Sequence, residues 1–442
     1  MPRPVELTAT EAVAEIARGT ISAEEYTRAC LEQIVAAEVD VQAFAHLDPE
    51  HALTQARALD RHRLEGRSIG PLHGVPVGIK DIFDTADYPT ECGSPLLAGR
   101  RPRSDAAAVR KLRDAGAVII GKTVTTEFAY FHPGKTRNPR NLQRTPGGSS
   151  SGSAAAVAAG MVPLAIGSQT NGSMIRPAAF CGVFGIKPSH GLISRAGVLT
   201  LSKTLDHIGA FARSVEDLAL ILDVLAGHDP ADPDTKAYAA PNFRAAVNEQ
   251  PPLPPSLAFV RTPMWDKADA EARNALEDLA KELDAREVDL PDEYRAAWEA
   301  QRIIMATDMA DNLGALIDKG GEISKPLRDL IAEGRKVTAV QYLAAVRDAR
   351  RYAEGLSGIF EQLSDAIITL SAKGAAPQGI GATGDPVFCS LWTLTGLPSV
   401  NLPLLQSAEG LPIGVQLIGA QRRDDRLLRT ARILVQKLAE AG

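Results

Sequence analysis

Hydrophobic and polar positions repeat with a helical period in some stretches of the chain and with a strand period in others. The pattern S/T-x-x-E runs from Thr8 to Glu11 and from Ser22 to Glu25, which predicts two capped amphipathic helices near the N-terminus. Residues 74–80 then form the first strand-like run. Because helices and strands continue to alternate after this point, the pattern predicts an α/β protein.

The second half of the chain resumes this alternation after a break. Residues 229–255 are rich in Pro, Asp and Ala, which indicates a connecting loop, and residues 267–364 are mostly charged helical sequence. Strands are expected at 256–260, 366–370 and 413–418, and helices at 214–227 and about 423–440. No internal repeat is visible. We therefore expect one large sheet in a single domain of residues 1–442, with the Pro-rich loop as a hinge between halves.

Two stretches combine glycine with serine, residues 146–153 (PGGSSSGS) and residues 169–177 (QTNGSMIRP). A Gly/Ser run is first interpreted as a flexible linker. Here the flanks are a helix-forming segment, 153–160, and an apolar strand-like run, 162–167, so the glycines belong to packed structure. Together with the lysine of Gly78-Ile79-Lys80-Asp81, these serines suggest a Ser/Ser/Lys hydrolase.

Two matches to familiar motifs are misleading. Residues 148–152 fit G-x-S-x-G, but no strand precedes them, and all 8 histidines lie at or before His228, so a late triad histidine is missing. Residues 116–123 fit the phosphate-loop pattern, yet their middle is the apolar run Ala-Val-Ile-Ile, which is itself a buried strand. The segment before it, 105–115, is expected to be a capped helix. We therefore exclude a nucleophile elbow and nucleotide binding.

Composition narrows the function classes only slightly. The chain has 442 residues, 45% hydrophobic and 23% charged, and a net charge of -6, which gives no footprint for nucleic acid or an anionic membrane. The cysteines, at positions 30, 92, 181 and 389, lack a C-x-x-C pair and are expected to be buried fillers. The N-terminus has no apolar signal core and no window is long enough to span a membrane, so we expect a cytoplasmic protein.

These motifs carry a resemblance to a known family. Residues 72–227 resemble the core of the amidase signature family, and residues 410–416 are similar to its C-terminal end. The most informative matches are the run Gly147-Gly148-Ser149-Ser150-Ser151-Gly152-Ser153, the run Gln169-Thr170-x-Gly172-Ser173-x-Ile175-Arg176-Pro177-Ala178, and Ser371 with Thr383-Gly384-Asp385-Pro386 and Leu391-Trp392-Thr393-Leu394. These details look most like the bacterial malonamidase branch. The resemblance covers most of the chain.

The resemblance implies a fold and a catalytic set. Lys80 matches the family's catalytic lysine, Ser149 its bridging serine, which follows a cis peptide bond, and Ser173 its nucleophile. The implied fold is one compact domain, in which a mixed, twisted sheet of about eleven strands is covered by helices on both faces. No metal and no organic cofactor is implied. The helical region of about 267–364 is expected to contribute to the pocket.

The chemistry can also be argued from the residues. A serine hydroxyl attacks an amide only when a base takes its proton, and a lysine is a base only when it is neutral. The pKa of Lys80 would have to fall by roughly 3 units from about 10.4, which burial in the sheet can cause. Lys80 would then take a proton from Ser149, which takes one from Ser173. The backbone N–H groups of Thr170, Asn171, Gly172 and Ser173 are the candidate oxyanion hole.

The chain departs from the commoner family pattern near the nucleophile. Asn171 stands where glycine is usual, which is tolerable because Asn visits positive φ, and Arg176 follows Ser173 by three residues instead of two. In the malonamidase branch the shifted arginine contacts a substrate carboxylate, so we expect Arg176 either to bind a carboxylate or to serve in a structural ion pair. His132 is a candidate substrate contact, with a surface loop residue as the alternative.

Three hypotheses about function follow. The first is an amidase that cleaves a small-molecule amide through an acyl-enzyme, such as a malonamate-like acid. The second is the ammonia-releasing amidase subunit of a tRNA-dependent amidotransferase, against which the motif pattern around Gln169 and Arg176 and the short chain argue. The third is a non-catalytic binding protein on the same fold. The expected partner is a small amide substrate, without nucleic acid or membrane, and a homodimer is a reasonable expectation.

Overall fold

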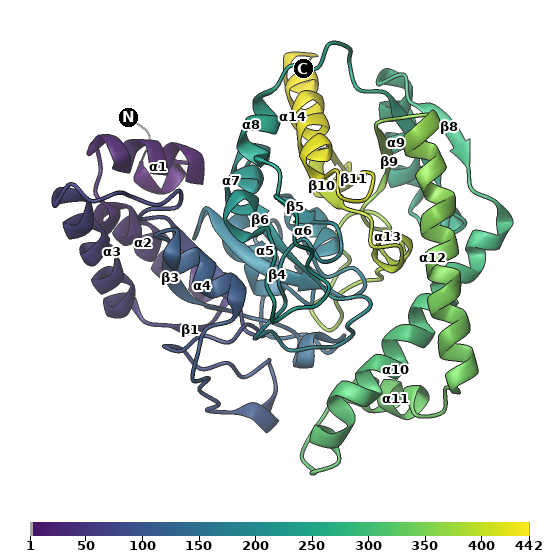
Figure 1. Ribbon diagram of the computed structural model, residues 1–442, viewed down its shortest axis with the longest axis horizontal. Coiled ribbons are helices and arrows are strands. Elements are labelled where there is room, and N and C mark those ends of the chain that lie inside the picture. The colour runs from purple at the N-terminus through teal and green to yellow at the C-terminus, as the bar shows by residue number, and fades with distance from the viewer. Residues whose placement is uncertain (1–2, 442) are drawn as a thin grey trace.

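The computed structural model describes residues 3–441, and one mixed β-sheet forms its centre (Figure 1). The strands are β1 (Phe44–Leu47), β2 (Pro76–Lys80), β3 (Val118–Thr123), β4 (Leu164–Gln169), β5 (Phe184–Lys187), β6 (His207–Ala212), β7 (Leu257–Arg261), β8 (Arg286–Asp289), β9 (Ala366–Leu370), β10 (Ser399–Gln406) and β11 (Pro412–Ile418). Their order across the 11-stranded sheet is β1-β3-β2-β4-β6-β5-β10-β11-β9-β7-β8. Pairing is parallel within β3-β2-β4 and within β9-β7-β8, and antiparallel elsewhere.

Helices cover both faces of this sheet. They are α1 (Ala9–Arg18), α2 (Ala23–Val41), α3 (Pro49–Leu64), α4 (Ala107–Asp114), α5 (Ser151–Ala158), α6 (Ile175–Cys181), α7 (Val215–Leu225), α8 (Phe243–Asn248), α9 (Ala270–Glu282), α10 (Ala297–Ile317), α11 (Lys325–Gly334), α12 (Ala339–Gln362), α13 (Ser390–Leu394) and α14 (Asp424–Ala441). Alternate residues of β4 serve two separate cores, since Leu164 and Ile166 pack in the cluster with α4, α7 and α14, and Ala165 packs with α2, α3 and α5. The expected single-domain α/β fold of about eleven strands is confirmed.

Local sequence signals explain where several elements begin. The side chains of Thr8 and Ser22 accept hydrogen bonds from the N–H groups of Glu11 and Glu25, so both predicted capping boxes are present. Residues 116–123 contain β3, which is buried at every position, so no phosphate loop exists there. The four cysteines are buried and free, as expected. Among residues 3–441, no helix is long and apolar enough to cross a membrane.

Three local predictions are wrong or incomplete. The Pro-rich stretch contains α8, because Asn242 caps its first turn and the pair Phe243 and Val247 is buried on one side. The charged helical region contains β8, a strand at the edge of the sheet. Its residues are mostly polar and exposed, so the sequence lacks the alternation of apolar and polar residues that indicates a strand. Asp105 does not cap α4, since its carboxylate accepts from the Ala86 N–H and pairs with Arg113 instead.

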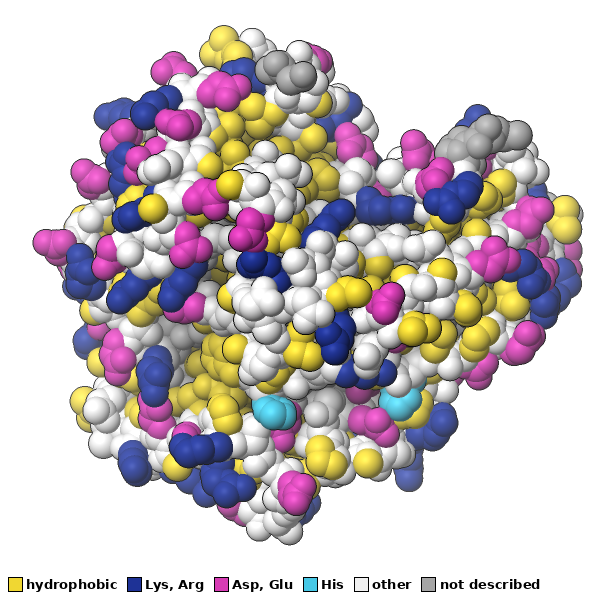
Figure 2. All heavy atoms as spheres, turned by 180° about the vertical axis from the view of Figure 1, so that it is seen from behind, with side chains coloured by type: hydrophobic (Ala, Val, Ile, Leu, Met, Phe, Trp, Pro, Cys, Tyr) yellow, Lys and Arg dark blue, Asp and Glu magenta, His cyan; other side chains and the backbone are white. Residues whose placement is uncertain are grey.

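The helices α10, α11 and α12 stand beside the sheet, on the right of Figure 1. They contact one another, and α10 also contacts α13. On the opposite side of the molecule, Figure 2 shows basic and acidic side chains interspersed over the surface, without one dominant sign. Of these three helices, α10 lies near the ends of the central strands, where the candidate active site is found.

Candidate active site

The candidate residues meet where two parallel neighbours, β2 and β4, end. Lys80 is the last residue of β2, and Ser168 lies next to the last residue of β4. Ser149 stands just before α5 and Ser173 just before α6, so the loops that enter these helices carry both serines. Ligand sites in α/β proteins form at this edge because loops leave the carboxyl ends of parallel strands together.

Lys80 is fully buried and bonded only to hydroxyl groups. Its Nζ donates to Ser149 Oγ at 2.7 Å and to Ser168 Oγ at 2.9 Å. In the described chain no carboxylate forms an ion pair with it. Burial therefore lowers the pKa of Lys80 to about 7, an effect that Asp206 and Cys92 oppose in part. A lysine with this pKa is partly neutral near pH 7 and can accept a proton.

Neighbouring serines bond elsewhere. Ser150 Oγ donates to the Ser168 carbonyl at 3.2 Å, and Ser151 Oγ donates to the Val124 carbonyl at 3.3 Å. Ser149 is thus the serine of this run that meets the lysine, and it follows a cis peptide bond from Gly148. The sequence did not single out Ser168, because a lone serine inside an apolar strand carries no motif.

Ser149 and Ser173 line the same narrow cavity of about 20 Å³, together with Thr170, Asn171 and Gly172. In residues 3–441, no protein acceptor takes a hydrogen bond from the backbone N–H groups of residues 170–173. Unpaired amides beside a buried hydroxyl are suited to stabilise an oxyanion. Asn171 does not take a positive φ, so asparagine is accommodated here without that conformation.

Arg176 is buried at the wall of this cavity. Its Nη2 donates to the Gly148 carbonyl at 2.7 Å and to Thr383 Oγ1 at 3.3 Å, while Nε and Nη1 have no partner among the described residues. Phe131 lies 5.8 Å from the guanidinium carbon. Burial lowers the pKa of Arg176 to about 10. The structural ion pair considered as an alternative finds no carboxylate within the described chain.

His132 does not join this group. Its side chain is exposed and does not line the cavity, and only its backbone carbonyl is engaged, by the Glu127 N–H. The preceding residues Tyr130 and Phe131 line the cavity instead. The alternative considered for His132, a surface loop residue, agrees with its exposed side chain.

An outer cavity of about 320 Å³ adjoins the narrow one. The two share Tyr130, Phe131, Asn171 and Met305, and the outer cavity is also lined by Gln301 of α10. The helical region contributes Met305 and Met309 to the narrow cavity itself.

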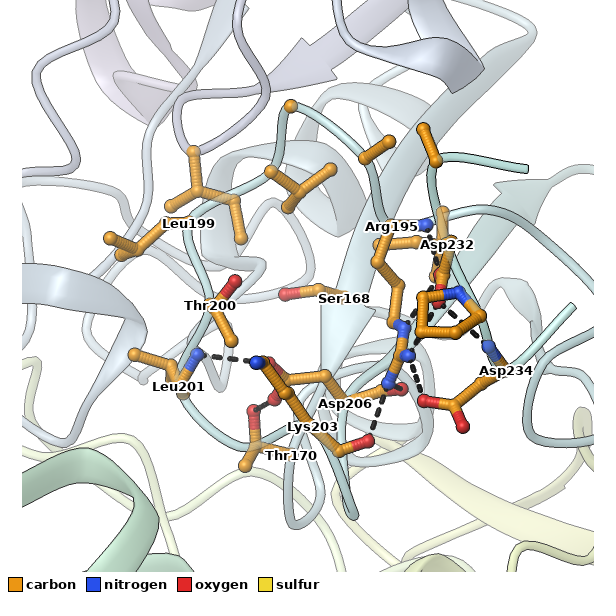
Figure 3. A pocket seen from close by; sticks show the side chains of 17 residues that line it. Ser168, Thr170, Arg195, Leu199, Thr200, Leu201, Lys203, Asp206, Asp232 and Asp234 are labelled. Atoms are coloured by element: carbon orange, nitrogen blue, oxygen red, sulfur yellow. Dashed lines mark hydrogen bonds and ion pairs between the residues drawn. The ribbon is translucent and has the colours of Figure 1, made fainter. Parts of the chain in front are cut away.

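Ser168 also lines a third cavity, of about 270 Å³ (Figure 3). In this cavity Arg195 forms ion pairs with Asp232 and Asp234, and Asp206 accepts a hydrogen bond from Thr170 Oγ1 at 2.6 Å. Ser173, the predicted nucleophile, lines the smaller cavity and not this one, so the smaller cavity is the candidate active site.

Comparison with known proteins agrees with this geometry. The family model described as amidase matches residues 25–428. One subunit of the glutamyl-tRNA(Gln) amidotransferase of Chloroflexus aurantiacus strain J-10-fl is 37% identical over 467 residues, covering 96% of this chain and 95% of that protein. The subunit of the same name from Acidothermus cellulolyticus is 35% identical, with 97% and 94% covered.

Solved structures share the whole fold. A chain from a vestigial protein complex related to the origins of an s-triazine catabolic enzyme is 32% identical, with a TM-score of 0.91 and 98% of both chains covered. The peptide amidase of Stenotrophomonas maltophilia is 31% identical, with a TM-score of 0.86 and coverage of 98% of this chain and 97% of that one.

Proposed function

Since this chain belongs to the amidase family and is a hydrolase of amide C–N bonds, we propose that it cleaves a primary amide with Lys80 as base, Ser149 as relay and Ser173 as nucleophile. One observation carries the proposal. A fully buried lysine without a carboxylate partner is bonded at 2.7 Å to Ser149, which lines one cavity with Ser173.

The reaction runs in two halves. Neutral Lys80 takes a proton from Ser149, and Ser149 takes one from Ser173 as Ser173 Oγ attacks the amide carbon. The proton returns along the same hydroxyls to the departing nitrogen, the C–N bond breaks, and ammonia leaves. Water then attacks the acyl-enzyme, with its proton passing to Lys80, and the acid is released as Ser173 recovers its proton. The N–H groups of residues 170–173 stabilise the oxyanion in both halves.

Arg176 gives the proposal its substrate class. A buried guanidinium with two nitrogen atoms unpaired and no acidic partner is unfavourable unless a ligand satisfies it. A carboxylate on the substrate would form charge-assisted hydrogen bonds with it. We therefore propose a compact amide that bears a carboxylate, such as a malonamate-like acid, in keeping with the motif resemblance to the malonamidase branch.

A second candidate is the ammonia-releasing subunit of a tRNA-dependent amidotransferase. It is supported by the relatives that carry this name, more strongly than those relatives support a free-standing amidase. The argument from the short chain fails, because the chain covers 95% of the Chloroflexus protein. The hypothesis of a non-catalytic binding protein is set aside, since the chain belongs to a family of amide hydrolases.

Ammonia release over a panel of amides tests the chemistry. The panel contains malonamate and L-glutamine as carboxylate-bearing amides and propionamide and benzamide as neutral ones, with Ser173→Ala as the blank. We expect Arg176→Met to lose acidic substrates by about 10- to 100-fold, the value of a charge-assisted contact, and neutral ones much less. Equal losses for both kinds would contradict the carboxylate role. No release by the wild type would contradict the amidase proposal.

Purification tests whether the protein works alone or as a subunit of a larger complex. A protein that hydrolyses the panel alone, with turnover unchanged by cell extract, is a free-standing amidase. A protein that co-purifies with further subunits from its native cells, and gains L-glutamine hydrolysis in that complex, is the amidotransferase subunit. Labelling of Ser173 by an alkyl fluorophosphonate, located by peptide mass, checks the nucleophile in either setting.

A further inference from the structure

The turn that carries the nucleophile is held by side chains from outside the catalytic set. Asn171 Oδ1 accepts from Ser390 Oγ at 2.7 Å, and its Nδ2 donates to Gln301 Oε1 at 3.4 Å. Gln301 lies on α10 and Ser390 begins α13, so two helices that are distant in sequence both form hydrogen bonds with the Asn171 side chain. Gly172 packs tightly here too, since a Cβ at this position would lie 2.8 Å from Pro386 Cβ.

The carbonyl groups of the same turn are also engaged. Gln301 Nε2 donates to the Thr170 carbonyl at 3.3 Å, and Thr393 Oγ1 donates to the Asn171 carbonyl at 2.5 Å. The Gly172 carbonyl accepts from the Arg176 N–H at 3.1 Å. Three successive peptide oxygens are thus fixed by partners of the surrounding protein.

Because a peptide group is planar, hydrogen bonds to its carbonyl oxygen also set the direction of its N–H group. In a planar trans peptide the C=O and the following N–H point in opposite directions. Holding the carbonyls of Thr170 and Asn171 therefore fixes the direction of the N–H groups of Asn171 and Gly172, residues that line the nucleophile cavity. Those N–H groups have no acceptor in the described protein, so they are available to an oxyanion.

Thr393 connects this arrangement to the start of α6. Its Oγ1 accepts from Gln169 Nε2 at 2.9 Å, and Gln169 Oε1 accepts from the N–H groups of Met174 and Ile175 at 2.7 and 3.0 Å. The one proton of this hydroxyl has two acceptors within reach, the Asn171 carbonyl at 2.5 Å and the more distant Cys389 carbonyl at 3.1 Å. The bond accepted from Gln169 strengthens its donation to the nearer carbonyl. The turn is therefore braced on both sides of Ser173.

We propose that Gln301 and Thr393 are positioning residues that preorganise the oxyanion hole, by fixing the carbonyls of Thr170 and Asn171 so that the next two N–H groups face the cavity. Ser390 assists by holding the Asn171 side chain. The inference rests on the proposed amidase chemistry, and it assigns a catalytic purpose to α10 and α13, which contribute no reacting group.

Thr393→Val is the decisive variant, because it removes one hydroxyl at nearly constant shape. Thr395→Val is its matched control, since the buried Thr395 hydroxyl donates only to the Leu391 carbonyl of the same short helix. Thr393→Ser restores the hydroxyl, and Gln301→Met removes the other bond. Each protein is assayed with the amide of the panel that the wild type hydrolyses fastest, and with an alkyl fluorophosphonate whose labelling rate reports attack by Ser173.

Misdirecting a donor should cost somewhat less than the roughly 10²- to 10³-fold loss that follows its removal. We expect Thr393→Val and Gln301→Met to lower kcat and the labelling rate by about 10-fold or more, with KM and the pH of half-maximal rate unchanged. Thr393→Ser and Thr395→Val should keep near wild-type rates, and the two valine variants should melt alike.

Equal rates for Thr393→Val and Thr395→Val, or a change confined to KM, would overturn the positioning role. A shared loss of thermal stability that accounts for the rate loss would do the same. Failure of the amidase proposal looks different, because the wild type itself would then neither release ammonia nor react with the fluorophosphonate.

Discussion

Lys80 and Lys122 lie on adjacent strands of the sheet, are both fully buried, and have very different partners. Lys122 Nζ lies 3.0 Å from Asp81 Oδ1 and donates to Thr90 Oγ1 at 2.6 Å and to the carbonyls of Phe83 and Pro89. Lys80 has two serine hydroxyls and no carboxylate. Burial lowers the pKa of both amines, but the Asp81 carboxylate opposes this effect at Lys122.

The difference shows what converts a buried lysine into a base. Burial alone disfavours the ammonium, and a nearby carboxylate restores it. Lys187 extends the comparison, because it is also fully buried, donates to the Leu397 carbonyl at 2.5 Å, and has its pKa lowered to about 7. Among the described residues its amine donates only to carbonyl groups, whereas Lys80 donates to Ser149, which lines the nucleophile cavity. A lowered pKa thus becomes useful for catalysis only beside hydroxyls that reach the substrate.

Of the substitutions that test this comparison, the removal of Lys80 should have the largest effect on activity. We expect Lys80→Met to lower kcat by at least about 10³-fold, as the loss of a unit of a catalytic set does. The protein should stay folded, because the change removes a buried amine that lacks an ionic partner. Ammonia release and thermal melting check both statements. A variant that retains a tenth of wild-type activity would show that Lys80 is not the base.

Removing the other lysine should have the opposite outcome. Lys122→Met leaves the buried Asp81 without its cation, so we expect a loss of about 3 to 5 kcal/mol in the free energy of unfolding. Urea unfolding measures this loss. The fraction that remains folded should still be labelled by the fluorophosphonate, and Lys122→Met as stable as the wild type would contradict the structural role of this pair.

The pH dependence of the reaction sharpens the contrast. Lys80 is active when neutral, so kcat/KM should fall about 10-fold per unit below a pKa of about 7 and level off above it. Lys122 titrates without consequence for the rate. A profile that is flat between pH 5 and 8 would be inconsistent with a neutral lysine base.

Ser168 offers the smallest change. Its hydroxyl accepts from Lys80, and loss of an acceptor disfavours the ammonium. We expect Ser168→Ala to move the acid limb of the pH profile to lower pH, with kcat reduced by no more than about 10-fold, the upper range for one hydrogen bond between neutral groups. Ser168→Thr, which keeps a hydroxyl, serves as the control. A shift to higher pH would contradict the assigned contact.

Part of the fold and part of the candidate site could be predicted from the sequence, and the remaining contacts could not, for physical reasons. Local signals located the capping boxes at Thr8 and Ser22 and the buried strand that ends at Lys80, because each depends on neighbouring residues. The contact of Lys80 with Ser168 arises from the pairing of β2 and β4, which no local pattern encodes. The hydrogen bonds of Gln301 to the turn that carries Ser173 likewise depend on how α10 packs.

The titration of Lys80 itself tests the account most directly. Protein with ¹³C-labelled lysine ε-carbons would be followed by NMR between pH 5 and 11, with Lys80→Met and Lys187→Met used to assign the two buried amines whose pKa is lowered to about 7. We expect the signal lost in Lys80→Met to titrate near pH 7. A signal for Lys80 that titrates near 10, as an exposed lysine does, would contradict a neutral base and with it the proposed mechanism.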